Sequence, residues 1–302
     1  MLFPATDRLG RTTPRVFQVV ECGRCGLMRL HPQPSREELR TSSPGDPWLA
    51  PGSGLADRLE QALRRLALCD HVSLVRRALR ESGETGPVLV VSGGSGTLVQ
   101  MLRQEGVAVL SFDPEFEAAS WCWRRGGVPS MCGRLGQAPL PPESCAVVTL
   151  FHVLEHLPDP YAGVDSARKL LRPQGRLIVQ APNAACWQFL LLGENWSGLD
   201  VPRHLVDFRA RDLEALLDSC GFQVLRRKYF SLCDNPTGFA TSLAPWLDPT
   251  VRRVRRLAEG PRKKLFKDLA YLTLVMAALP FTVVEAACQA GSTFLVEACK
   301  KT

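Results

Sequence analysis

Nearly continuous apolar runs alternate with helical patterns through the middle of the chain. Four runs have the composition of strands buried on both faces of a parallel sheet: residues 88–91, 107–112, 146–151 and 176–180. Three segments between them repeat apolar residues at helical spacing: residues 97–105, 115–125 and 160–171. Strands and helices in this alternating order predict right-handed crossover connections and a parallel sheet of the α/β class.

The segments on either side of this core have weaker patterns. Residues 55–82 carry leucine and valine at helical spacing, and residues 41–54 are rich in proline, glycine and serine, which predicts a linker. The segment 171–175 predicts a turn, and Leu213 to Gly221 predicts a helix that ends at the glycine. Two late segments predict further strands: residues 222–230 and 293–299.

Composition narrows the classes of function. The 302 residues are 45% hydrophobic and 22% charged, close to globular averages, which excludes wholesale disorder. The net charge of +7 is mild, and no basic stretch is interleaved with aromatic residues, so we expect no nucleic-acid partner. The 11 cysteines are scattered and odd in number, which favours free thiols in a reducing cytoplasm. The first residues also lack the apolar stretch of a signal peptide.

A glycine-rich turn follows the first core strand. Ser92, Gly93, Gly94 and Gly96 lie where the backbone can approach a ligand at the carboxyl edge of the sheet. Asp113 ends the second core strand, where a carboxylate can accept both hydroxyl hydrogens of a ribose. The spacing does not fit G-x-G-x-x-G, which disfavours a nicotinamide oxidoreductase. A nucleoside ligand without a pyrophosphate suits this looser turn.

A longer series of motifs continues beyond the glycine turn. It comprises Phe151–Pro160 (FHVLEHLPDP), Leu170–Val179 (LLRPQGRLIV), Pro182-Asn183, Pro202–Leu205 (PRHL) and Leu213–Phe222. In order and spacing these motifs resemble the Rossmann-like, class I S-adenosylmethionine-dependent methyltransferases, in the branch that includes quinone-biosynthesis O-methyltransferases. The resemblance covers residues 86–302. It implies a doubly wound mixed sheet of about seven strands, the last one antiparallel, with helices on both faces.

The resemblance also implies where the cofactor binds. It assigns S-adenosylmethionine to the glycine turn, to Asp113 and Pro114, and to Phe151 and His152 at the end of the strand before the FHVLEHLPDP motif. Three positions depart from the family pattern, because Val90 and Ala146 replace acidic residues within strands and Ser92 replaces the first loop glycine. A non-catalytic binding protein with a weakened cofactor site is therefore an alternative.

The N-terminal segment matches one half of a zinc ribbon in this branch. Cys22, Cys25 and Gly26 fit the second cysteine knuckle, but residues 1–21 contain no cysteine for the first. Zinc prefers four ligands, and His31 brings the candidates only to three. We therefore expect a metal-free remnant in a segment 1–54, followed by a methyltransferase domain at 55–302 with its core at 86–182 and a substrate region at 183–302.

The resemblance implies transfer of a methyl group to a small-molecule acceptor, with O-methylation as the default. Such a displacement gains from alignment of the reactants and from a general base. His156, beside Glu155, and His204, beside Arg203, are the candidate bases, because imidazole titrates near neutral pH. Both histidines could instead be structural.

A basic and apolar region lies between residues 252 and 284. Eight arginines and lysines occur from Arg252 to Lys267, and an uncharged stretch follows from Leu269 to Val284. This stretch is shorter than the roughly 20 residues that span a bilayer. We expect a solvated basic helix followed by a core helix over the sheet. The alternative is an interfacial helix on an anionic membrane, which would suit a lipid or quinone acceptor.

Overall fold

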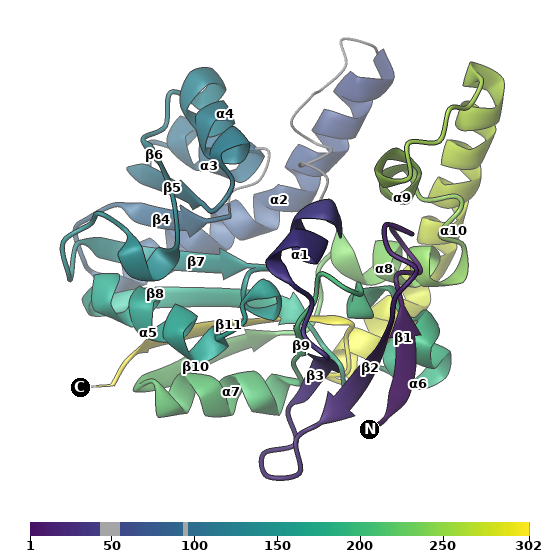
Figure 1. Ribbon diagram of the computed structural model, residues 1–302. Helices are drawn as coiled ribbons and strands as arrows, with labels where there is room; N and C mark the ends of the chain where they lie inside the picture. The colour runs from purple at the N-terminus through teal and green to yellow at the C-terminus, as the bar shows by residue number, and fades with distance from the viewer. Residues whose placement is uncertain (43–54, 93–95, 302) are drawn as a thin grey trace. The chain divides into compact units, whose positions relative to one another are not determined.

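The computed structural model describes residues 1–42, 55–92 and 96–301 (Figure 1). The chain forms two compact units, each assembled from three segments. The first unit contains Met1–Pro47, Ala181–Leu213 and Lys228–Phe294. The second contains Trp48–Gln180, Glu214–Arg227 and Leu295–Thr302. The predicted domain boundary at residues 54 and 55 borders the segment 43–54, outside the described residues, so that division stays a prediction.

The second unit is built around a seven-stranded sheet. Its strands are β4 (Val88–Val91), β5 (Val109–Asp113), β6 (Ser130–Cys132), β7 (Cys145–Phe151), β8 (Leu171–Pro182), β10 (Phe222–Lys228) and β11 (Thr293–Lys300). Their order is β10-β11-β8-β7-β4-β5-β6, and the strands from β8 to β6 are parallel (Figure 1). The opposite end is antiparallel, which confirms the predicted Rossmann-like mixed sheet.

Helices cover this sheet as the alternating pattern predicted. They are α2 (Leu55–Ser82), α3 (Thr97–Gln104), α4 (Phe116–Gly126), α5 (Pro160–Leu170) and α7 (Ala210–Ser219). α3 and α4 pack against β5, and α2 and α5 against β7. The β4 strand is buried along its whole length, and Val90, Leu102, Val147 and Ile178 belong to one apolar core with α2 and α3.

The first unit has a small antiparallel sheet of its own. Its strands are β1 (Phe3–Thr6), β2 (Val16–Glu21), β3 (Met28–His31) and β9 (Val206–Asp207), in the order β1-β2-β3-β9. Phe17, Leu30 and Trp196 lie in the core of this unit. Its helices are α1 (Arg36–Ser42), α6 (Trp187–Leu192), α8 (Asp234–Leu243), α9 (Pro249–Val254) and α10 (Pro261–Ala287).

The structure corrects three expectations. The N-terminal piece, for which we predicted no strands, contributes three, and the predicted turn 171–175 forms the irregular start of β8. The predicted core helix at 269–284 is the greater part of α10, in which only Ala278, Thr282 and Glu285 are buried. The interpretation as a core helix over the sheet is therefore wrong, because many of the large apolar side chains of α10 are exposed.

Candidate functional site

The carboxyl ends of β4 and β5 bring two predicted cofactor residues together. The strands are paired in parallel with Val91 beside Phe112, and the Ser92 amide donates to the Phe112 carbonyl oxygen at 2.7 Å. Asp113 follows directly and is only 5% exposed. One oxygen of its carboxylate accepts from the Glu115 amide at 2.9 Å. A carboxylate has about four lone-pair positions and can accept several hydrogen bonds.

Two residues around the glycine turn have left-handed backbone conformations. Ser92 has φ of 53° and Gly96 has φ of 69°. A Cβ atom on Gly96 would lie 3.0 Å from the sulfur of Cys122, so a glycine there lets α3 and α4 pack closely. Ser92 adopts a conformation that favours glycine, which explains why the family pattern has glycine at its position. Gly93 and Gly94 lie outside the described residues.

Val90, where the family pattern has an acidic residue, lies between two buried hydroxyl side chains. Val90 pairs with Ser111 on one side and Thr149 on the other, so the three side chains share one face of the sheet. Within the described part of the chain, the hydroxyls of Ser111 and Thr149 are fully buried and have no hydrogen-bond partner. An acidic residue at position 90 could accept from such hydroxyls, whereas valine cannot. Ala146, the other departure, is also fully buried.

A chain of hydrogen bonds begins at the end of β7. His152, with φ of 53°, places Nδ1 3.1 Å from the Glu155 carboxylate and Nε2 3.0 Å from the Gln180 amide nitrogen. The Gln180 amide oxygen lies 2.7 Å from His71 Nε2. Phe151 packs against the His71 ring with centroids 4.8 Å apart. The chain links β7, the 3₁₀-turn Leu154–His156, β8 and α2.

These contacts fit one arrangement of protons. His152 Nδ1–H donates to the buried Glu155 carboxylate, which leaves His152 Nε2 as the acceptor for the Gln180 amide. His71 Nε2–H then donates to the Gln180 oxygen. Because its Nε2 lone pair is occupied, His152 is held as a positioning group at the end of β7. Sequence reasoning missed this network; Glu155 three residues after His152 was a signal, but nothing pointed to His71.

The two candidate bases lie in different compact units. His156 is exposed in the 3₁₀-turn of the second unit. His204 is buried in the first unit, with Nδ1 2.8 Å from the Gly198 carbonyl oxygen and Nε2 3.8 Å from the Asp200 carboxylate. Arg203 donates to the same carboxylate from Nε at 2.8 Å, and Asp200 raises the pKa of that guanidinium. No observation tests which histidine acts as the base, so both stay predictions.

The cysteine knuckle has the backbone turn expected between metal-ligating cysteines. The Gly26 amide donates to the Cys22 carbonyl oxygen at 2.8 Å, and the Cys22 amide donates to Leu27 at 3.0 Å. The backbone amides of Cys25 and Arg24 lower the pKa of the Cys22 thiol. Neither observation tests whether zinc binds, so a metal-free segment stays a prediction.

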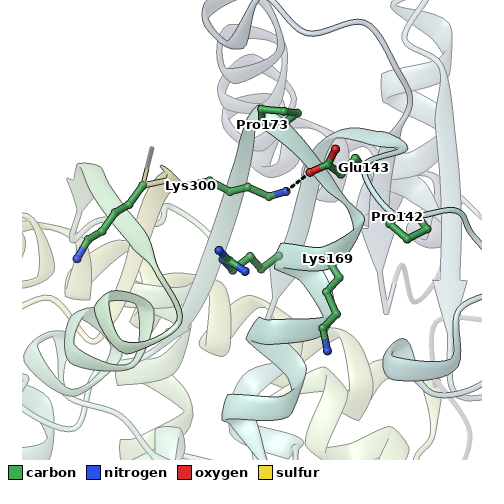
Figure 2. Close-up of a pocket in the computed structure, with 7 residues that line it drawn as sticks. Pro142, Glu143, Lys169, Pro173 and Lys300 are labelled. Carbon is green, nitrogen blue, oxygen red and sulfur yellow. Dashed lines mark hydrogen bonds and ion pairs between the residues drawn. The ribbon is translucent and has the colours of Figure 1, made fainter.

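A surface pocket of about 490 Å³ lies at the other end of the strands in the second unit (Figure 2). Glu143, just before β7, and Lys300, at the end of β11, face each other across it with an ion pair of 3.5 Å. The remaining lining residues are Pro142, Arg168, Lys169, Pro173 and Lys301. Because Asp113 and His152 lie at the carboxyl ends of β5 and β7, this pocket is separate from the candidate cofactor site.

Comparison with known proteins gives the family. A methyltransferase-domain family matches residues 59–227, which is more than half of the chain. The chain belongs to this methyltransferase-domain family. Within 95 aligned residues, this methyltransferase-family chain is 35% identical to a probable S-adenosylmethionine-dependent methyltransferase of Mycolicibacterium smegmatis, over 30% of this chain and 34% of that protein. The family assignment agrees with the motifs found in the sequence.

Two further relatives are similar to this chain in sequence. The ubiquinone biosynthesis O-methyltransferase of Pseudomonas fluorescens is 27% identical over 173 residues, 53% of this chain and 74% of that protein. That of Psychrobacter arcticus is 31% identical over 38% of this chain and 48% of its own length. The matched regions span about a third of the Mycolicibacterium smegmatis protein and about half of the Psychrobacter arcticus protein.

Solved structures share the fold of this methyltransferase-family chain. A putative sarcosine dimethylglycine methyltransferase from Galdieria sulphuraria aligns with a TM-score of 0.52 and 14% identity, over 77% of this chain and 86% of that one. An S-adenosylmethionine-dependent methyltransferase from Archaeoglobus fulgidus aligns with a TM-score of 0.50 and 15% identity, over 80% and 94%. At these identities the likeness establishes the fold alone.

Proposed function

We propose that this chain is an S-adenosylmethionine-dependent methyltransferase that methylates a hydroxyl group of a small-molecule acceptor. The observation that carries the proposal is the buried Asp113 carboxylate beside the end of β4, in a chain of the methyltransferase-domain family. The ubiquinone biosynthesis O-methyltransferases among its relatives support a hydroxyl as the acceptor and a phenol or quinone precursor as the acceptor class.

The described residues fit an adenosyl ligand. The Asp113 carboxylate would accept from the ribose hydroxyls, and the backbone of Ser92, Gly96 and Pro114 would border the nucleoside. The Pro114 carbonyl oxygen faces the Cys132 thiol at 3.6 Å, which holds the loop after β5. When bound, S-adenosylmethionine supplies an electrophilic methyl group on a sulfonium sulfur. We also include Gly93, Gly94, Phe151 and His152 in the proposed cofactor site.

Removal of the hydroxyl proton is assigned to a histidine. We propose His156, which is exposed directly after the buried Glu155, as the base that takes this proton. His204 is the second candidate, because it follows Arg203 in the PRHL motif and its Nδ1 is held by the Gly198 carbonyl oxygen. His152 and Glu155 would hold the end of β7 in place rather than take the proton.

Calorimetry with S-adenosylmethionine tests the cofactor part. We expect binding to the full chain, and Asp113→Ala should weaken it about 100-fold, since charged hydrogen bonds contribute about 1.5–3 kcal/mol each. Asp165→Ala is the matched control, because it removes a carboxylate whose visible partner is the surface Lys169, at 2.7 Å. Absence of heat at millimolar cofactor would favour the non-catalytic alternative and overturn the proposal.

A cofactor labelled in its methyl group tests the transfer. Label should appear as an ether on catechol or hydroquinone acceptors, and label on carbon or nitrogen would contradict O-methylation. We expect His156→Ala to lower kcat at least 100-fold with cofactor affinity unchanged. Normal turnover in His156→Ala and a loss in His204→Ala would transfer the role of base to His204.

Location and partners complete the proposal. All eleven cysteines fall within the described residues and are free thiols, which supports a reducing, cytoplasmic compartment. The knuckle at Cys22 and Cys25 supports membership of the branch with an N-terminal cysteine segment. The region 252–284 adds a membrane surface as a proposed partner.

A further inference from the structure

The outer face of helix α10 is apolar along nearly its full length. Seven large apolar side chains on this helix are between 49% and 72% exposed: Leu265, Phe266, Leu269, Leu272, Met276, Val283 and Val284. Their spacing of three, four and seven residues puts them on one stripe of the helix. We call this stripe the outer face. Globular monomers rarely expose an apolar patch of this extent without a binding function.

Polar contacts on the opposite side fix the rotation of α10. Glu285 is fully buried and accepts from the Gln188 amide at 3.0 Å and from its side chain at 2.9 Å. Tyr271 places its hydroxyl 2.9 Å from that of Thr241. Turning α10 to bury its outer face would break these bonds. The outward orientation of the apolar stripe is therefore specified by the contacts within this unit.

Cations gather at the amino-terminal end of the outer face. Arg256, Arg262, Lys263 and Lys264 are exposed. Two neighbouring cations are used internally, since Arg252 pairs with Glu259 at 2.8 Å and with Asp268, and Lys267 pairs with Glu259 at 2.5 Å. The only acidic residues of α10 are the paired Asp268 and the buried Glu285. The outer face therefore combines apolar area with positive charge and carries no carboxylate.

We propose that the outer face of α10 docks on an anionic lipid bilayer and lies in the plane of its interface. Leu269, Leu272 and Met276 would insert among the acyl chains, while Arg262, Lys263 and Lys264 contact anionic headgroups. The helix is about 40 Å long, which gives an extended contact. Under the proposed function, this docking would give the enzyme access to an apolar acceptor dissolved in the membrane.

The charge distribution favours a membrane over a second copy of the chain. Pairing two outer faces would bury apolar area but would supply no carboxylates for the exposed cations. A bilayer with anionic lipids supplies negative charge along its whole surface. Of the described helices, α10 alone is long and apolar enough to cross a membrane, with a mean hydropathy of 1.8 over 18 of its residues. Spanning would, however, pull Glu285 and Tyr271 from their partners, so the helix lies on the surface.

Flotation of the full-length protein with vesicles tests the docking. We expect binding to vesicles of phosphatidylcholine with one-third phosphatidylglycerol, and binding at least tenfold weaker to pure phosphatidylcholine. Leu269→Glu combined with Met276→Glu should weaken binding at least tenfold. Leu66→Glu is the matched control, because Leu66 is 63% exposed on α2 and should leave binding unchanged. Replacing Arg262, Lys263 and Lys264 with glutamine should remove the preference for anionic vesicles.

Three outcomes would overturn the proposal. One is an absence of flotation with anionic vesicles at low salt. Another is a dimer in sedimentation that Leu269→Glu dissociates, which would assign the face to a second copy. The third is resistance to alkaline extraction from membranes, which would indicate a spanning helix. Circular dichroism of each variant confirms folding. Vesicle binding is measured without cofactor or acceptor, so its result is independent of methyl transfer.

Discussion

Two regions of the molecule differ from the usual arrangement of apolar side chains inside and polar side chains outside. The interior of the β4–β5–β7 sheet buries polar groups, and the outer face of α10 exposes apolar ones. Ser111 and Thr149 place hydroxyls in a fully buried layer without a described partner. Leu265 and Phe266 place large apolar groups in solvent. Both arrangements cost free energy, and proteins accept such local conflicts mainly at functional sites. The first adjoins the candidate cofactor site and the second is the proposed membrane contact.

The two regions differ in the kind of partner that their side chains lack. The sheet hydroxyls flank Val90, where the family pattern has an acidic residue, so they lack a group that this sequence has replaced. The α10 side chains lack a surface outside the chain. Substitutions in the sheet should therefore change the free energy of unfolding, whereas substitutions on α10 should change binding.

The largest effect is expected where buried polar side chains are bonded to one another. Gln180→Leu removes the link between His152 and His71 and should lower the free energy of unfolding by about 2–3 kcal/mol, because it strands a buried imidazole nitrogen. Urea unfolding measures this change. Adding His71→Phe should recover part of the loss; purely additive effects would contradict the coupling.

A gain in stability is expected where the polar group is unsatisfied. Thr149→Val keeps the shape of the side chain and should raise the free energy of unfolding by about 1 kcal/mol. Thr241→Val is the control, because the Thr241 hydroxyl is bonded to Asp248 and Tyr271, and its removal should cost about 1–2 kcal/mol. If both variants shifted the thermal unfolding temperature in the same direction, the distinction between an unsatisfied hydroxyl at Thr149 and a bonded one at Thr241 would be contradicted.

A smaller gain is expected at the glycine turn. Ser92→Gly relieves a left-handed conformation at φ of 53° and should raise the free energy of unfolding by about 0.5–1 kcal/mol. It should also strengthen cofactor binding in calorimetry. Ser92→Ala keeps the backbone restriction and should bring neither gain. Equal stability and equal cofactor affinity of the two variants would show that the effect comes from loss of the serine side chain and not from the backbone conformation.

The smallest effect on stability is expected on α10. Leu272→Glu alters a half-exposed side chain and should change the free energy of unfolding by less than about 0.5 kcal/mol. Its main effect should be weaker binding to anionic vesicles in the flotation assay. A loss of more than 2 kcal/mol in urea unfolding would mean that the outer face is covered within the folded protein.

Periodicity predicted most of the sheet because its strands are short apolar runs between clear helices. The same logic failed for α10, since an apolar stretch such as Leu269–Val284 has the same composition in a core as on a surface. Only tertiary contacts such as Glu285 with Gln188 decide which side faces inward. The strands β1, β2 and β3 were missed because they are only four to six residues long, and so short a pattern predicts little.

The candidate site was predictable in part. The prediction of a glycine turn and of Asp113 follows from the order of strand, turn and carboxylate; β4 and β5 do pair in parallel, and the binding of a cofactor there stays a prediction. The link from His152 through Gln180 to His71 joins residues far apart in sequence, and no local spacing encodes it. The choice between His156 and His204 likewise depends on where the acceptor binds.

The pairing of β3 with β9 has a consequence for biosynthesis. Met28 and Arg29 pair with Asp207 and Val206, which the ribosome adds only after most of the second unit has been translated. At about 5–20 residues per second, the early hairpin waits on the order of ten seconds for its last strand. During that interval an open strand edge is available to other nascent chains, so we expect this protein to depend on chaperones when expressed rapidly.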